Sequence, residues 1–191
     1  MRHSRASKQQ SHEQIVSTAA NCFREYGVDG ISIANLMKAV GMTHGGFYKH
    51  FKSRDDLVTQ ALDAALQSSN KRYHAMGKLK FKPFVQNYLS LRHRDNRAEG
   101  CALAALLNDM ARANAESRAL YRSQFERSVE RVAGLLEVTD EESRGSAMLI
   151  LSSMIGALSI ARALDDEALS EELLNAVQDY LIEHFADSAK E

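Results

Sequence analysis

The chain has 191 residues, of which 45% are hydrophobic and 26% charged, and its formal net charge is −1. A chain of this length and composition can bury a globular core without a disulfide or a metal, and it is too apolar to be disordered. Its two cysteines, Cys22 and Cys101, exclude a disulfide framework and have no zinc-site spacing. The first residues lack the apolar segment of a signal peptide, so we expect a cytoplasmic protein.

The residue types favour an all-α fold. Ala and Leu are abundant, Val, Ile and Thr are scarce, and there is one proline. Charge is unevenly distributed: residues 1–54 hold eight Lys and Arg against three Asp and Glu, whereas residues 55–191 hold 16 against 22. A basic N-terminal quarter on an acidic body predicts that this end binds a polyanion.

The first helices are predicted from apolar periodicity and from capping residues. An apolar stripe predicts a helix from about Ser11 to Tyr26, ended by Gly27. Ser32 caps a short helix over Ile33–Val40 that Gly41 ends, and Thr43 caps another over Thr43–Phe51. Two short helices joined by a glycine-containing turn are typical of a helix-turn-helix unit.

The rest of the chain is predicted to remain helical. Ser53 and Asp56 resemble a capping box at the start of a helix that reaches about Met76. Apolar residues then mark a helix over Phe81–Leu89, whereas the polar residues 92–100 predict a loop. The remaining predicted helices begin near Cys101 and near Ala115, and the last two span Asp140–Leu164 and Ala168–Asp187.

Residues 32–57, SIANLMKAVGMTHGGFYKHFKSRDDL, resemble the DNA-binding motif of TetR-type transcriptional repressors. The resemblance covers about the first third of the chain, and Met37 departs from it because the family usually has a small alanine there. The features that carry it are, in order, Ser32, Gly41, Thr43, Gly46, Phe47, Tyr48, His50, Phe51, Ser53 and Arg54. It implies an all-α protein with an N-terminal three-helix DNA-binding domain and a helical body for ligand binding and dimerisation.

The second helix of such a unit enters the DNA major groove, with phosphate contacts around it. Gly45 and Gly46 would allow close approach to DNA, His44 could contact a base or phosphate, and the resemblance makes Tyr48 and His50 phosphate anchors. Phe47 and Phe51 are expected to hold the helix on its neighbours. The predicted DNA-binding residues are Ser32, Thr43, His44, Gly45, Gly46, Tyr48, Lys49, His50 and Arg54. Arg2, Arg5 and Lys8 would form a mobile basic arm.

The segment Ser146–Ala163 carries one charge and is nearly apolar all round, which predicts a buried helix rather than a membrane span. The resemblance implies a homodimer in which the last two helices of each subunit form a four-helix bundle. The predicted interface residues are Met148, Leu151, Ser152, Ile155, Gly156, Leu158, Ser159, Leu173, Val177, Leu181 and His184. A core helix of a monomeric bundle is the alternative.

The resemblance also implies a small-molecule effector that releases a repressor from a palindromic operator. The predicted pocket residues are Phe84, Tyr88, Cys101, Leu106, Met110, Tyr121 and Phe125. No inward basic cluster is evident in the body, so the expected ligand is mostly apolar or aromatic. Cys101, at a predicted helix start, raises the alternative of a thiol or electrophile sensor.

These expectations assign residues 1–7 to the arm, 8–68 to the helix-turn-helix domain, and 69–191 to the ligand-binding and dimerisation domain. An enzyme is not predicted, because the sequence contains no nucleophile elbow, zinc-peptidase, dinucleotide-binding or Walker motif, and no cofactor or metal site. A helical adaptor protein that does not bind DNA is the remaining alternative.

Overall fold

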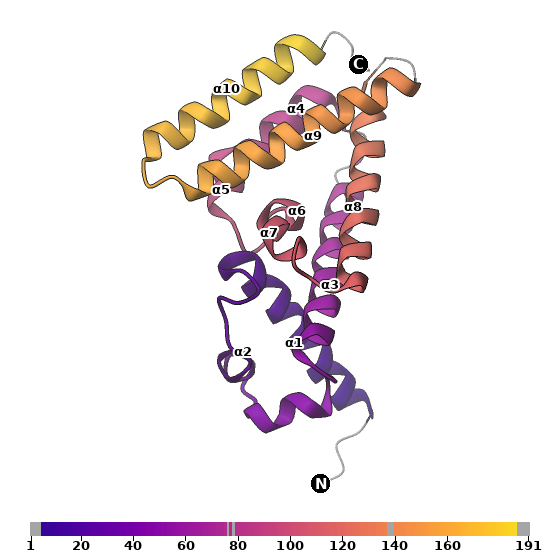
Figure 1. The fold of residues 1–191 in the computed structure, drawn as a ribbon, viewed down its shortest axis with the longest axis vertical. Coiled ribbons are helices and arrows are strands. Elements are labelled where there is room, and N and C mark those ends of the chain that lie inside the picture. Colours follow the sequence, from indigo (N-terminus) through magenta and orange to yellow (C-terminus); the bar gives the residue numbers. More distant parts are fainter. Residues whose placement is uncertain (1–4, 76, 78, 137–139, 187–191) are drawn as a thin grey trace.

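The computed structural model describes residues 5–75, 77, 79–136 and 140–186, and within these ranges the protein is helical with no strand. Figure 1 shows an elongated molecule with the N-terminal helices at one end and the last two helices at the other. The elements are α1 (Arg5–Tyr26), α2 (Ile33–Ala39), η1 (His44–Lys49), α3 (Arg54–Ala75), α4 (Phe81–Tyr88), α5 (Leu91–Asp95), α6 (Ala102–Ala105), α7 (Leu107–Met110), α8 (Ala115–Ala133), α9 (Asp140–Ala163) and α10 (Glu167–Phe185). The all-α prediction is confirmed.

Two glycines and two serines at the ends of α1, α2 and α3 act as the sequence predicts. Gly27 and Gly41 end α1 and α2 with φ values of +80° and +73°, a conformation that costs glycine little. The Ser32 hydroxyl accepts a hydrogen bond from the Asn35 N–H at the start of α2. At the start of α3, Ser53 accepts from the Asp56 N–H while Asp56 accepts from the Lys52 N–H, as in a capping box shifted by one residue.

Helix α1 begins at Arg5, six residues before the predicted start. Lys8 is therefore helical, and the predicted basic arm over residues 1–7 is wrong from residue 5 onward. Good helix formers such as Ala6, Lys8 and Gln9 explain the extension. Arg2, the other residue of that predicted arm, lies outside the described residues.

The second helix of the helix-turn-helix unit is a 3₁₀-helix over His44–Lys49, not the longer helix predicted over Thr43–Phe51. Short i to i+3 bonds close it, from the Gly46 N–H to the Thr43 carbonyl and from the His50 N–H to the Phe47 carbonyl. The Thr43 side chain makes no capping bond. Two adjacent glycines, each about 1 kcal/mol worse than alanine in an α-helix, explain the difference.

Helix α3 leaves the N-terminal unit and runs alongside α8 into the body (Figure 1). The predicted loop over residues 92–100 contains helix α5, whose first turn is capped by the Ser90 hydroxyl. The helix predicted to begin near Cys101 is broken at Leu106 into α6 and α7, because Leu106 leaves the helical region with φ −112° and ψ 12°.

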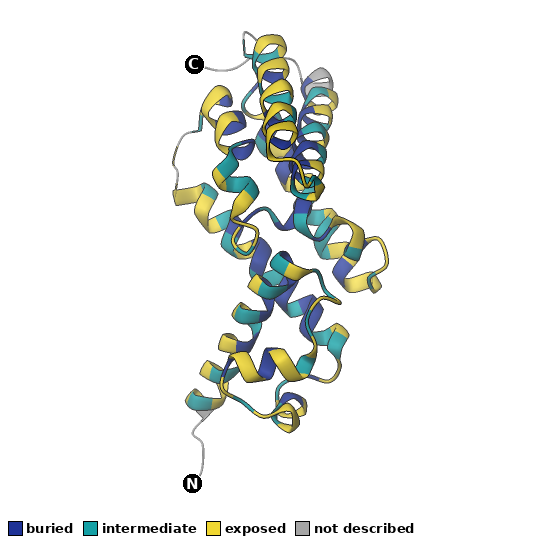
Figure 2. Ribbon diagram, turned by 90° about the vertical axis from the view of Figure 1, so that its left-hand side faces the viewer, coloured by how far each residue is buried: buried dark blue, intermediate teal, exposed yellow. Residues whose placement is uncertain are grey.

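Two buried clusters form the core, one beneath α1–α3 and one in the body. Phe23, Phe47 and Leu57 are nearly inaccessible in the first, and Ile150, Met154 and Leu158 in the second (Figure 2). The first cluster also takes in Ala102, Leu106 and Met110 from α6 and α7, so the two halves pack against one another. The predicted domain boundary at residue 68 falls within α3.

Helix α9 packs against α8 and α10. Its segment Ser143–Ala163 is long and apolar enough to cross a membrane by length and composition alone, which a core helix of a soluble protein also satisfies. Its inward side, with Ala147, Ile150, Met154 and Leu158, is buried, as the sequence predicted for this segment.

Candidate functional site

The 3₁₀-helix η1 presents an exposed surface at the N-terminal end of the molecule. Thr43, His44, Gly45, Tyr48 and Lys49 are exposed, and the Tyr48 side chain is 65% accessible. Phe47 and Phe51 are buried beneath them, with ring centroids 5.2 Å apart. The buried rings belong to one core cluster with side chains of α1, α2 and α3, so the polar side chains of η1 face outward from a packed base.

Ser32 and Gly46 lie beside this surface. Ser32 is exposed, and its oxygen already caps α2, which leaves its hydroxyl hydrogen free for an outside acceptor. Gly46 is half-buried, and Met37 fills the space behind it: a Cβ added to Gly46 would lie 3.6 Å from the Met37 methyl group. The family departure at Met37 is thus accommodated inside the core.

His50 is half-buried at the edge of the same surface. Its ring centroid lies 5.9 Å from that of His12, and its Nδ1 is buried without a hydrogen-bond partner. Burial, followed by the nearby His12 and Lys8, lowers the pKa of His50 below its ordinary value of 6.5. An outside hydrogen-bonding group, such as a phosphate, would supply the missing partner.

Arg54 is used inside the protein. Its guanidinium donates to the backbone carbonyls of Val28 and Ile31 and lies 3.9 Å from the Asp29 carboxylate. It therefore holds the turn between α1 and α2 against the start of α3. A phosphate contact from Arg54, as the sequence suggests, stays a prediction.

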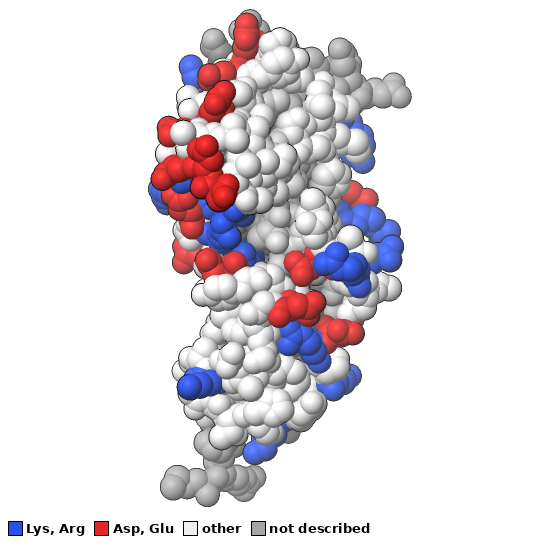
Figure 3. Space-filling model, turned by 60° about the vertical axis from the view of Figure 1, so that its left-hand side comes forward, with Lys and Arg blue, Asp and Glu red and all other residues white. Residues whose placement is uncertain are grey.

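The charged side chains support an anion-binding role for this end. On the face shown in Figure 3, the part of the molecule nearest the N-terminus shows Lys and Arg but no Asp or Glu. Acidic side chains gather instead toward the opposite end. The charge asymmetry of the sequence is thus a spatial asymmetry on this face.

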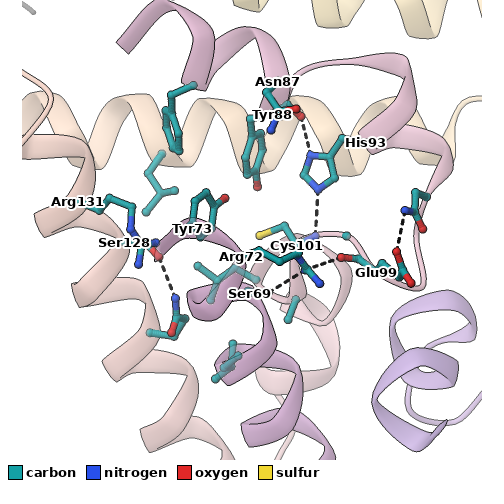
Figure 4. A pocket seen from close by; sticks show the side chains of 18 of the residues that line it. Ser69, Arg72, Tyr73, Asn87, Tyr88, His93, Glu99, Cys101, Ser128 and Arg131 are labelled. Carbon is teal, nitrogen blue, oxygen red and sulfur yellow. Dashed lines mark hydrogen bonds between the residues drawn. The ribbon is translucent and has the colours of Figure 1, made fainter. Parts of the chain in front are cut away.

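A cavity of about 270 Å³ lies in the body between α3, α4, α5, α6 and α8. Figure 4 shows Tyr88 reaching into it from α4 and Tyr73 from α3. Apolar side chains from Leu66, Phe84, Leu103, Val132 and Leu151 form much of its wall. The polar and charged residues around it are Ser69, Arg72, Tyr73, Asn87, Tyr88, Ser90, Arg92, His93, Asn96, Glu99, Cys101, Gln124, Ser128 and Arg131.

Phe84, Tyr88 and Cys101 line this cavity, as the sequence suggested, and the other four predicted pocket residues do not. Leu106 and Met110 are buried in the N-terminal core because α6 and α7 turn toward α1. Tyr121 donates its hydroxyl to the Leu103 carbonyl at 2.8 Å, and Phe125 packs against the body core. Cys101 is half-buried, and its thiol-sensor role stays a prediction.

The sequence suggested no inward basic cluster in the body, yet three arginines border the cavity. They are the half-buried Arg131 of α8 and the exposed Arg72 and Arg92 of α3 and α5. Arg131 lies over the Tyr73 ring, 4.4 Å from its centroid. Helical periodicity could not find this cluster, because its members come from three elements far apart in sequence.

One rim of the cavity, residues 93–101, is held by arginines from three helices. Arg24 of α1 donates to the Ala98 carbonyl, Arg72 of α3 to the Glu99 carbonyl at 2.6 Å, and Arg162 of α9 to the His93 carbonyl at 2.8 Å. The contact from Arg24 connects the cavity rim directly to the N-terminal unit. None of these contacts has a local sequence signal.

The predicted dimer residues divide between the surface and the core. Leu151, Ile155, Leu158 and Leu181 are at most 6% exposed, so placing them in an interface with another subunit is wrong: they fill the core of their own chain. Ser152 and His184 are exposed, whereas Met148, Gly156, Ser159, Leu173 and Val177 are half-buried. The large apolar side chains that do face outward are Leu149 and Ile160 on α9 and Leu169 and Tyr180 on α10.

Comparisons with known proteins agree with this arrangement. Residues 15–61 match the family model described as bacterial regulatory proteins, tetR family. The HTH-type transcriptional repressor Rv1474c of Mycobacterium tuberculosis is 41% identical over 44 residues, which are 23% of this chain and 24% of that protein. The HTH-type transcriptional regulator AcrR of Shigella flexneri is 35% identical over 52 residues, 27% of this chain and 24% of its own length.

The match to these curated relatives thus spans about a quarter of their length. A solved structure extends the likeness over the whole fold. The TetR transcriptional regulator from Chloroflexus aurantiacus superposes with a TM-score of 0.74 at 24% identity, covering 94% of this chain and 98% of that one. The helical body is therefore similar in fold, while the sequence likeness is concentrated in the helix-turn-helix unit.

Proposed function

Because the chain belongs to the TetR family of bacterial regulatory proteins, we propose that it is a homodimeric repressor that binds a palindromic operator in double-stranded DNA and is released by a small molecule. The observation that carries the proposal is the exposed polar surface of η1 over a rigid aromatic base. No catalytic role is proposed for any residue.

The proposed DNA contacts follow from the exposure of each residue. His44 and Gly45, at the start of η1, are exposed and would face base edges in the major groove. Tyr48 and Lys49 are exposed, and His50 has an unpaired nitrogen, so these three would bind phosphates. Ser32 and Thr43 add hydroxyl donors from the flanking positions.

The proposed effector site is the cavity in the body. Its wall is formed by residues of α3, α4, α5, α6 and α8, and α6 also contacts α1 of the N-terminal end. In the dimer, the two DNA-binding units must be spaced to fit the operator. An effector that binds more tightly to a different spacing would release the DNA. A hundredfold difference in the affinity of the effector for the two spacings corresponds to about 2.7 kcal/mol. The helix α3, which spans both halves, is the proposed lever.

The DNA-binding proposal is tested with the variant Tyr48→Phe. The Tyr48 hydroxyl is exposed, so its removal should leave stability unchanged and weaken binding to every duplex by about 1 kcal/mol, through one lost phosphate contact. Tyr26→Phe is the matched control, since Tyr26 is 63% exposed at the far end of α1. Fluorescence anisotropy with duplexes selected from a random pool, repeated over a salt series, measures both.

The selected duplexes should be palindromic, with half-sites about 10 bp apart or a multiple of that distance. His44→Ala should change the preferred bases more than the overall affinity. Salt-independent binding, or a Tyr48→Phe variant indistinguishable from Tyr26→Phe, would contradict the proposal and favour the adaptor alternative.

A further inference from the structure

The polar lining of the body cavity carries a surplus of positive charge. Arg72, Arg92 and Arg131 line it, and Glu99 is the single carboxylate among its lining residues. His93 adds no charge at neutral pH, because burial lowers its pKa below the ordinary value of 6.5. The cavity therefore has a positive potential that a neutral or cationic occupant would not use.

These arginines have no carboxylate partner among the residues that the structure describes. By contrast Arg94, just outside the cavity, lies 2.7 Å from the Asp95 carboxylate and 3.3 Å from that of Glu167. Arg131 instead donates to the Asn70 side chain at 3.2 Å and lies over the Tyr73 ring. A half-buried guanidinium without a carboxylate partner favours an anion brought from outside.

Tyr88 supplies an independent indication of a ligand. Its side chain is 4% exposed, and its hydroxyl is buried with no hydrogen-bond partner of normal geometry, although Cys101 lies close enough to raise its pKa after the larger effect of burial. Figure 4 shows the Tyr88 ring directed into the cavity. A buried hydroxyl without a partner is costly, and an acceptor atom on a ligand would remove that cost.

The remaining wall and the volume limit the rest of the molecule. Phe84, Leu103, Val132 and Leu151 contribute apolar side chains to the wall of the cavity. A cavity of about 270 Å³ lies just below the range of pockets for drug-sized ligands, roughly 300–1,000 Å³, and so suits a small occupant such as a benzoate ion.

We propose that the cavity binds a small monocarboxylate with an aromatic or branched apolar body, its acid group facing Arg72 and Arg131 and an acceptor oxygen meeting the Tyr88 hydroxyl. The role of this carboxylate as the effector rests on the function proposed above, whereas the binding of the carboxylate to the cavity does not. The proposal keeps the apolar or aromatic body that the sequence suggested for the ligand and adds an acidic head group.

Isothermal titration with three probes of equal shape tests the charge preference. Benzoate should bind the full-length protein, while benzamide and benzylamine should bind at least about tenfold more weakly, because charge-assisted hydrogen bonds to arginine are lost. Binding of benzamide or benzylamine as tight as that of benzoate overturns the proposal. So does the absence of benzoate binding at millimolar concentrations.

Variants locate the binding site. Arg131→Gln should weaken benzoate binding about tenfold or more, Arg131→Lys should restore part of it, and Tyr88→Phe should weaken it by a smaller factor. Arg122→Gln is the control, because Arg122 is exposed on the same helix and does not line the cavity. If Arg131→Gln unfolds, Arg72→Gln takes its place. Equal binding by the control and the cavity variants overturns the assignment.

A second measurement separates this inference from the proposed function. Operator binding is followed by anisotropy with and without benzoate. If benzoate binds with the expected preference but leaves DNA binding unchanged, the ligand class stands and the role as effector fails. If DNA binding is normal and benzoate does not bind, the ligand class alone fails.

Discussion

His93 connects the rim of the cavity to the helices around it through both ring nitrogens. Nδ1 lies 2.7 Å from the Tyr88 carbonyl, and Nε2 lies 3.0 Å from the Cys101 amide nitrogen. Since a carbonyl only accepts and an amide N–H only donates, Nδ1 carries the hydrogen and Nε2 accepts. A proton added to Nε2 would face the Cys101 N–H, so the folded state requires the neutral ring.

This arrangement predicts a pH dependence of stability. Burial lowers the pKa of His93 below 6.5 in the folded state, so the unfolded chain binds more protons between that lowered pKa and 6.5. The stabilisation that the folded state gains from neutral His93 is therefore fully present above pH 6.5. It is lost as the pH falls from 6.5 through the lowered pKa. Urea unfolding above pH 6.5 and about one unit below it should show a drop in the free energy of unfolding.

The variant His93→Gln should be less stable at neutral pH but should lose less of its remaining stability on acidification. His50, whose pKa is also lowered, contributes a similar dependence that both proteins share. A parent and a His93→Gln variant with the same drop would contradict this assignment. Asp56 affects stability only in a more acidic pH range, because backbone and side-chain hydrogen bonds lower its pKa below the ordinary value of 3.8.

Residues whose role is local were predictable from the sequence. Ser32 caps α2, and Phe47 and Phe51 lie beneath η1, because capping and apolar spacing act within a few positions. The roles of Arg24, Arg131 and His93 were not predictable. Each depends on partners tens of residues away, and in sequence each looks like an ordinary solvated side chain.

At the scale of elements, the segment 93–101 is a connection held by side chains from α1, α3 and α9. Gly100 is buried within it, and a Cβ at this position would lie 2.7 Å from the Arg162 guanidinium and 2.9 Å from the Asn96 carbonyl. A glycine is therefore required where α9 approaches. Arg24 binds the same segment from α1, and burial followed by the nearby Arg72 lowers its pKa to about 10.

The variant Arg24→Gln should loosen this connection. Arg24 is 5% exposed, and its loss removes the bonds to the Ala98 carbonyl and, at 2.7 Å, to the Asn21 side chain. The free energy of unfolding should fall by about 1–3 kcal/mol, and the amides of residues 97–100 should exchange hydrogen faster. Arg118→Gln, an exposed arginine on α8, should change stability by less than about 0.5 kcal/mol. Unchanged exchange in Arg24→Gln would show that the arginine does not hold the rim.

Helix ends that a glycine marks were easier to predict than other boundaries. The ends of α1 and α2 are set by Gly27 and Gly41, which the sequence displays directly. Residues 92–95 of helix α5 were predicted as a loop because RHRD has no apolar stripe, and His93 and Arg94 bind groups outside this helix. The 3₁₀ form of η1 depends on two glycines whose effect periodicity does not measure.

For the whole molecule, the outer face of α9 and α10 is notable because it leaves large apolar side chains exposed. Leu149, Ile160, Leu169 and Tyr180 are 47–57% exposed on two adjacent helices. In the view of Figure 3, a broad uncharged surface at this end of the molecule is bordered by acidic side chains. An apolar patch with a charged border is typical of a protein interface. A second subunit that places its own α9 and α10 there would complete a four-helix bundle.

Two substitutions on α9 separate the interface from the core. Ile160→Glu places a charge on the exposed face and should give a folded monomer in sedimentation equilibrium. Leu158→Glu, two residues earlier, places the charge where the side chain is fully buried and should unfold the chain. Leu107→Glu is the surface control, because Leu107 is 43% exposed on α7 and should leave the dimer intact.

The same variants test how dimerisation supports DNA binding. A monomer contacts one half-site, so Ile160→Glu should bind the full palindrome no more tightly than it binds a single half-site, whereas Leu107→Glu should keep the parent's preference for the palindrome. An Ile160→Glu protein that still sediments as a dimer would remove the α9–α10 face from the interface. The proposed DNA-binding surface of η1, at the opposite end of the molecule, would be unaffected by that result.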